Sequence, residues 1–173
     1  MIHSLQSVCL VPCLALALTT LPTQVAAQQT TANFIDAEGS PSGIATLTPS
    51  TGGVLIAIEV NGLPAAQWVA FHVHENGSCD PASGHDSAGG HFNPSQTTHG
   101  LLTETGPHAG DMPNIWVDES GTARAEDFNP YVVLGEGENS ILGRALMFHA
   151  NADDHVSQPS GDAGDRLACA EIG

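Results

Sequence analysis

The chain has 173 residues, of which 41% are hydrophobic and 13% are charged. This length suggests one domain with a real hydrophobic core, and the composition disfavours a solvated, disordered chain. Three arginines and no lysine stand against nineteen acidic residues, so the formal net charge is −16. Because phosphate binding needs clustered Lys and Arg, no nucleic-acid partner is expected, and an acidic membrane surface is disfavoured for the same reason.

The N-terminal segment has the features of an export signal. The apolar run 8–18 is short for a bilayer span, and the small residues 25–27 follow it as a cleavage site. We therefore expect residues 1–27 to be a signal peptide and residues 28–173 to be one exported domain, periplasmic or extracellular. The alternative is a buried N-terminal helix, since the segment lacks the basic residues usual in signal peptides.

Four cysteines are present, and two of them, Cys9 and Cys13, lie in the expected signal peptide. Lipid attachment at Cys13 is rejected because Pro12 stands where a small residue is required, so we expect no membrane anchor. Cys79 and Cys169 remain, and two cysteines in an exported protein favour one disulfide over two free buried thiols. Closing so long a loop contributes about 4–5 kcal/mol in the chain-entropy model.

Eight short segments are rich in β-branched and apolar residues and are bounded by turn formers, which is the pattern of β-strands. They are 32–36, 43–48, 53–62, 67–74, 114–117, 122–127, 141–149 and 166–172. The first four are expected to form an antiparallel meander, and no stretch has a sustained helical period. The predicted fold is all-β: an eight-stranded antiparallel Greek-key sandwich or flattened barrel.

Two long segments, 75–113 and 150–165, do not fit this succession of short strands and turns. They are rich in Gly, Asp, His and Pro and hold most of the histidines. Long loops inside a compact domain are usually either functional or disordered. We predict two long functional loops.

Two histidines share one face of the fourth predicted strand. Side chains alternate along Val69-Ala70-Phe71-His72-Val73-His74, so His72 and His74 point to the side opposite Phe71. Two rings held near one point on a stiff strand suit a transition metal. An isolated His-x-His pair is a weak indication, because strand histidines are often simply exposed; His149, which ends another apolar strand, is a candidate further ligand.

A second group of candidate ligands follows in the first long loop. Its members are three histidines and one carboxylate: His91, His99, His108 and Asp111. Imidazole nitrogens with one carboxylate make a plausible tetrahedral zinc set. The spacing is loose, so the loop would have to fold around the ion, and the alternative is a scatter of surface histidines.

At this point the sequence resembles a known family. The stretches 70–75 and 161–169 are similar to the two signature stretches of copper/zinc superoxide dismutases, and the candidate ligands between them occur in the order of that family. The resemblance covers essentially all of residues 28–173. It implies dismutation of superoxide to dioxygen and hydrogen peroxide, with one copper ion and one zinc ion per subunit. The position of Cys79 between the ligands resembles the bacterial exported branch, so a homodimer stays open without a known geometry.

The resemblance also implies the ligand sets. The copper ligands would be His72, His74, His91 and His149. The zinc ligands would be His91, His99, His108 and Asp111. His91 would bridge the two ions as an imidazolate and carry a proton during catalysis.

Further residues receive roles from the resemblance. Asp153 would hydrogen-bond one histidine of each metal, although a solvated carboxylate is the alternative. Cys79 and Cys169 would form the family disulfide. Arg166 would be the catalytic cation that pairs with superoxide beside copper.

Some alternatives stay open on the sequence alone. Arg166 could be a surface residue paired with Asp162 or Asp165. His85 and His155 match no ligand position, so both are expected to be loop residues, with His155 also a candidate for extra metal binding. A noncatalytic copper carrier or metallochaperone on the same fold would be expected to lack the bridge or the arginine. A zinc hydrolase would need an open coordination position on zinc, and this chain offers too many ligands to leave such a position open.

Overall fold

A computed structural model describes residues 28–173, so the expected signal peptide at 1–27, with Cys9 and Cys13, lies outside the described residues. In the described part of the chain nine strands form one sheet: β1 (Thr30–Asp36), β2 (Pro41–Ser50), β3 (Gly53–Val60), β4 (Gln67–Val69), β5 (Phe71–His74), β6 (Ile115–Val117), β7 (Ala123–Asn129), β8 (Ala145–His149) and β9 (Arg166–Glu171). Two single 3₁₀ turns, η1 (Pro81–Ser83) and η2 (Asp86–Ala88), follow β5. Within this range, no helix has the length and apolar character needed to cross a membrane.

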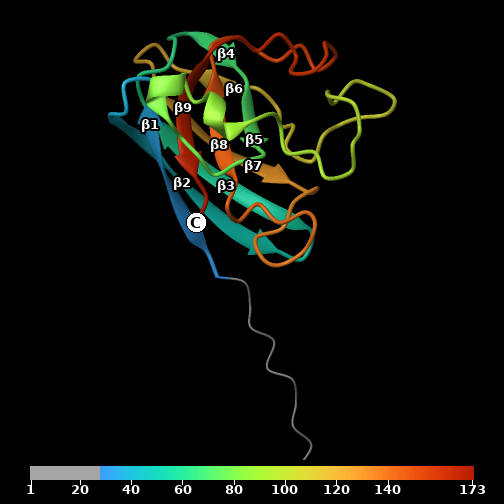
Figure 1. Ribbon diagram of the computed structural model, residues 1–173. Helices are drawn as coiled ribbons and strands as arrows, with labels where there is room; N and C mark the ends of the chain where they lie inside the picture. Colours follow the sequence, from blue (N-terminus) through green and yellow to red (C-terminus); the bar gives the residue numbers. More distant parts are fainter. Residues whose placement is uncertain (1–27) are drawn as a thin grey trace, which may run out of the picture.

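The sheet is antiparallel and rolls into a nearly closed barrel (Figure 1). Its strand order is β4-β6-β7-β3-β2-β1-β9-β8-β5. The first three strands form the predicted meander, but the fourth does not continue it, because β3 pairs with β7 on its other side. The all-β Greek-key barrel with two long loops is therefore confirmed, and the four-strand meander is wrong in its last step.

All eight predicted strands are present, and one of them is divided in two at Ala70. Its first half, β4, pairs with β6, whereas its second half, β5, pairs with β8. Ala70 donates its N–H to Asn151 O and accepts a hydrogen bond from His149 N. The two ends of the sheet are thus consecutive in the chain, which is why the barrel nearly closes.

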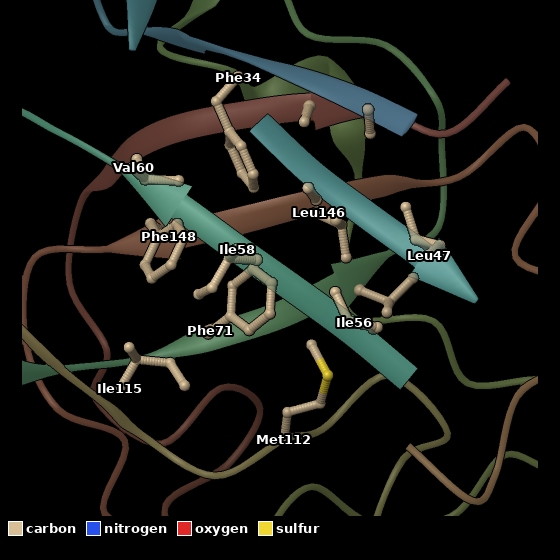
Figure 2. Packing of buried hydrophobic residues seen from close by; sticks show 14 of the residues in the cluster. Phe34, Leu47, Ile56, Ile58, Val60, Phe71, Met112, Ile115, Leu146 and Phe148 are labelled. Carbon is tan, nitrogen blue, oxygen red and sulfur yellow. The ribbon is translucent and has the colours of Figure 1, made fainter. Parts of the chain in front are cut away.

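The barrel interior is packed with apolar side chains that opposing strands direct inward from one face of the sheet (Figure 2). The Phe71 ring stacks on Phe148 with centroids 4.5 Å apart, and Phe34 packs against Phe148 at 5.6 Å. All three are fully buried, and burial of a side chain of this size contributes about 1.5–3 kcal/mol. The predicted alternation is confirmed: Phe71 faces this core, and the next residue, His72, faces away.

The predicted disulfide is present between Cys79 and Cys169, which are 90 residues apart. It joins the long loop after β5 to strand β9. A hydrogen bond from Cys79 N to Glu171 Oε1, 2.8 Å long, fastens the same stretch of loop to the same strand. The loop is therefore attached to the strand that begins at Arg166.

Candidate metal centre

Seven buried side chains converge into two groups that share one histidine. The first cluster consists of His72, His74, His91 and His149. The second cluster consists of His91, His99, His108 and Asp111. Within each cluster the possible ligand atoms lie within 4.8 Å of one another. The residues that the sequence placed in two metal sites are thus brought together in two adjacent groups.

The loosely spaced loop residues reach the site because the loop pairs with the outer edge of β5. Isolated bridges join His74 to His91 and His72 to Asp111. Val73 binds both loop segments, since its N–H donates to Gly110 O at 2.9 Å and its carbonyl accepts from Phe92 N at 2.8 Å. Otherwise this edge would leave backbone groups unpaired.

Glycine is required at position 110 by this close approach. A Cβ on Gly110 would lie 2.2 Å from Val73 O and 3.0 Å from Phe92 N. No side chain fits between the loop backbone and β5 at that distance. The loop therefore folds onto the strand through a position that only glycine can occupy.

In the first cluster, backbone carbonyls fix which ring nitrogens carry protons. His74 Nδ1 donates to Gly89 O at 2.9 Å, and His149 Nδ1 donates to Gly164 O at 3.3 Å. In the neutral rings the two Nε2 atoms then both bear lone pairs, yet they lie only 3.2 Å apart. Two facing lone pairs need a cation between them.

The other two rings of the first cluster present free nitrogens as well. Within the described residues, His72 Nδ1 and His91 Nε2 are buried and have no hydrogen-bond partner. Such atoms are costly to bury unless something binds them. Four imidazole nitrogens aimed at one place form a donor set that suits copper.

Burial keeps these rings neutral. It lowers the pKa of His149 to about 3, with help from the neighbouring His72, and the pKa of His91 to about 4. It lowers the pKa of His74 well below its usual range and also that of His72, where Asp153 partly offsets the effect. Neutral imidazoles have the lone pair that a metal requires.

The second cluster is arranged around one carboxylate oxygen. Asp111 Oδ1 lies 2.8 Å from His91 Nδ1, 3.1 Å from His99 Nδ1 and 3.3 Å from His108 Nδ1. Its other oxygen accepts backbone N–H groups from Gly100 and His108. Burial raises the pKa of the Asp111 carboxyl, but the histidine hydrogen bonds outweigh burial and hold it well below its usual range. Three nitrogens and one ionised oxygen form the donor set of tetrahedral zinc.

Asp153 connects the two clusters through hydrogen bonds to one histidine of each. Its Oδ2 accepts from His72 Nε2 at 2.8 Å and its Oδ1 from His99 Nε2 at 3.0 Å. It is 3% exposed, so it is not the solvated carboxylate that the sequence left open. Burial lowers the pKa of His99, but Asp111 and Asp153 outweigh it and raise that pKa to about 9. One buried carboxylate thus orients a ring in each cluster.

Asn114 holds Asp153 in turn, and the sequence offered no sign of this contact. Asn114 Nδ2 donates to Asp153 O at 2.8 Å, and Asn114 Oδ1 accepts from Asp153 N at 2.7 Å. Asn114 Nδ2 also lies 3.2 Å from His155 Nε2. His155 is half-buried and belongs to neither cluster.

Arg166 lies at the start of β9 and lines an open cavity of about 370 Å³ together with His74, His91 and His149. Its Nη1 donates to His85 O and its Nη2 to Gly89 O, both at 2.7 Å. Its one ion-pair partner among the described residues is an exposed residue, Asp86, with Oδ1 at 3.8 Å from Arg166 Nε. The expected alternatives, Asp162 and Asp165, form no ion pair with it in the range 28–173. A larger cavity of about 700 Å³ lies beside residues 134–136 and holds none of the histidines.

Comparisons with known proteins agree with this geometry. The family described as copper/zinc superoxide dismutase matches residues 41–172. The chain is 47% identical over 145 residues to copper–zinc superoxide dismutase 2 of Aquifex aeolicus, with 82% of this chain and 84% of that protein covered. It is 37% identical to a copper–zinc superoxide dismutase of Deinococcus radiodurans, with 92% of each covered.

Solved structures are similar as well. A superoxide dismutase-like protein from Bacillus subtilis superimposes with a TM-score of 0.79 at 33% identity, over 83% of this chain and 97% of that one. The copper/zinc superoxide dismutase from Brucella abortus superimposes with a TM-score of 0.71 at 28% identity, over 84% of this chain and 100% of that one.

Substitution of Gly161 should weaken zinc binding by the second cluster. A Cβ there would lie 1.8 Å from Asp153 Oδ1 and 2.8 Å from His99 Nε2, so Gly161→Ala should break the hydrogen bond between them. We expect the zinc affinity to fall about tenfold or more, as measured by competition with a chromogenic chelator. Gly143→Ala is the matched control, because the φ of Gly143 is 73° against 68° for Gly161 and nothing lies within 4 Å of its Cβ position. An unchanged affinity in Gly161→Ala would show that Asp153 does not orient His99.

Proposed function

The chain belongs to the copper/zinc superoxide dismutase family, and we propose that its two histidine clusters are the copper and zinc sites of that enzyme. It is a superoxide dismutase, which converts superoxide to dioxygen and hydrogen peroxide with one copper and one zinc ion. The observation that carries the site assignment is the position of His91, which is a member of both clusters.

The donor atoms distinguish the two metals. The first cluster offers nitrogen only, through His72 Nδ1 and the Nε2 atoms of His74, His91 and His149, and this set suits copper. The second cluster offers three Nδ1 atoms and a carboxylate oxygen, which suits zinc. His91 would use Nε2 toward the first metal and Nδ1 toward the second.

The residues would divide the work of catalysis. Bound copper supplies the one-electron chemistry that superoxide requires, whereas zinc has none. His91 lines the cavity, and its Nε2, which finds no hydrogen-bond partner in the described chain, would hold a proton for the reaction. Its Nδ1 would stay beside Asp111, so the ring would keep its place while Nε2 gains or loses the proton. Arg166 would hold the incoming anion through its fixed positive charge.

The rival function, a noncatalytic copper carrier on the same fold, is not favoured. A carrier needs neither a histidine common to two clusters nor an arginine directed into the cavity. In this chain His91 is the histidine common to both clusters, and Arg166 is the arginine that lines the cavity. Both features support catalysis.

Single ligand substitutions should separate the two metals. His74 belongs to the first cluster only and His108 to the second only. We expect His74→Ala to lose copper and nearly all dismutation activity while retaining zinc, and His108→Ala to lose zinc first. Elemental analysis of each purified variant, coupled to a superoxide-dismutation assay, measures both. An active wild type without copper would contradict the proposed function, and zinc lost first from His74→Ala would contradict the assignment.

The acidic chain should not draw superoxide in over long distances. Arg166 is the one Arg or Lys among the described residues that line the cavity, with Glu75 on its wall and Asp86 beside the guanidinium. Charges beyond about 8–10 Å are screened at ordinary salt. We expect Arg166→Ala to lower the second-order rate about tenfold or more, Asp86→Asn to raise it, and Asp165→Asn to leave it unchanged or slightly raised.

Rate measurements from low to high ionic strength test this account. An enzyme that attracts its substrate through a positive field slows steeply as salt increases. Here the slope should be shallow or reversed, because the net charge is −16. A steep fall of the wild-type rate with increasing salt would mean that other positive groups attract superoxide to the site.

We also propose that residues 1–27 are a cleaved export signal and that the enzyme acts in the periplasm or outside the cell. The disulfide between Cys79 and Cys169 supports this, because such bonds persist in oxidising compartments. Mass spectrometry of the exported protein should find a chain that begins at Gln28. Recovery of the uncleaved chain, starting at Met1, from the cytosol would contradict the proposal.

A further inference from the structure

His85 has no place in either metal cluster, yet its side chain is fully buried. Its backbone is left-handed, with φ of 60° and ψ of 18°. This conformation is unfavourable for a residue with a side chain, and it persists only where the surroundings hold it. The contacts of His85 with its surroundings therefore hold the left-handed conformation in place.

The carbonyl of His85 is one of two acceptors that orient Arg166. The Arg166 Nη1 donates to His85 O and Nη2 donates to Gly89 O, each at 2.7 Å. The neighbouring carboxylate of Asp86 is 81% exposed and 3.8 Å away, so it restrains the guanidinium weakly. The direction of the guanidinium thus depends on two carbonyls of the segment 85–89.

The ring of His85 anchors that segment to the barrel. Its Nε2 lies 3.1 Å from Asp36 O and, facing a carbonyl, must donate its proton. Asp36 ends β1 and pairs there with Ala168, two residues beyond Arg166 on β9. The ring and the carbonyl of His85 therefore connect the loop to the same pair of strands at two points.

We propose that His85 is a positioning residue for Arg166, whose guanidinium it holds in the cavity where superoxide binds. The ring fixes the left-handed turn to β1, and the turn aims the carbonyl at Arg166. This inference rests on the proposed function, because it concerns the cation that receives the substrate.

A double-mutant cycle with Arg166 separates this role from a general structural one. We expect His85→Phe, which keeps an aromatic ring without a donor, to lower the second-order dismutation rate about three- to tenfold. In the Arg166→Ala background the same substitution should change the rate less than about twofold, because the group on which it acts is gone. His85→Gln, which places an amide N–H at a similar reach, should restore most of the rate.

Nitrogen-15 NMR of the reduced, copper(I)- and zinc-loaded protein gives a readout besides activity. The chain has three arginines, so the side-chain signals of Arg124, Arg144 and Arg166 can be told apart. In the wild type we expect separate Nη signals for Arg166, since both nitrogens are held by carbonyls. In His85→Phe these signals should average while those of the other two arginines stay unchanged.

Ser87→Ala is the matched control in the same segment, since it removes a hydrogen bond to Ser78 O that does not involve Arg166. An equal loss of rate in Ser87→Ala, or full activity in His85→Phe, would overturn the inference. If His85→Phe does not fold, His85→Asn tests the same point, because Asn tolerates the left-handed conformation and is too short to reach Asp36 O. A fully metal-loaded wild type without dismutation activity would instead overturn the proposed function.

Discussion

The outer edge of strand β5 is the constraint on which the rest of this structure depends. One edge of β5 pairs with β8, and the other is completed by loop residues that hydrogen-bond to Val73. One face packs Phe71 into the barrel core, and the other carries His72 and His74. Core packing therefore fixes the position of two candidate ligands. The loop that completes the edge brings His91, His99, His108 and Asp111, and the remaining candidate, His149, ends β8.

The two clusters are costly to build without their ions. Several imidazole nitrogens are buried with no hydrogen-bond partner among the described residues, and His74 and His149 turn lone pairs toward each other. Burial of such groups destabilises a fold unless a cation satisfies them. Metal binding is therefore coupled to folding here, and Asp153 couples the clusters to each other because it holds one ring of each.

Charge is distributed differently at long and short range. The chain as a whole is strongly acidic, whereas the cavity presents one guanidinium beside the first cluster. The carbonyls of His85 and Gly89 hold Arg166 without cancelling its charge, as a buried carboxylate would. Gly89 O also accepts a hydrogen bond from His74, so one carbonyl fixes both Arg166 and a candidate copper ligand.

The sequence by itself determined the features that follow from local periodicity and from the order of chemical groups. Alternation along β5 placed His72 and His74 opposite Phe71, the order of histidines indicated two ligand sets, and two remaining cysteines indicated the disulfide. Only the tertiary structure decided that the fourth predicted strand divides at Ala70, because closure of the barrel depends on partners β6 and β8 far along the chain.

The same reason explains the contacts that the sequence did not reveal. Asn114 reaches Asp153, Arg166 reaches the carbonyl of His85, and the ring of His85 reaches Asp36. Each pair is separated by several strands and loops, and none has a periodic or compositional signal. Local sequence specifies which face of a strand a side chain occupies, but the partner across a gap is set only when the barrel closes and brings distant loops to one edge.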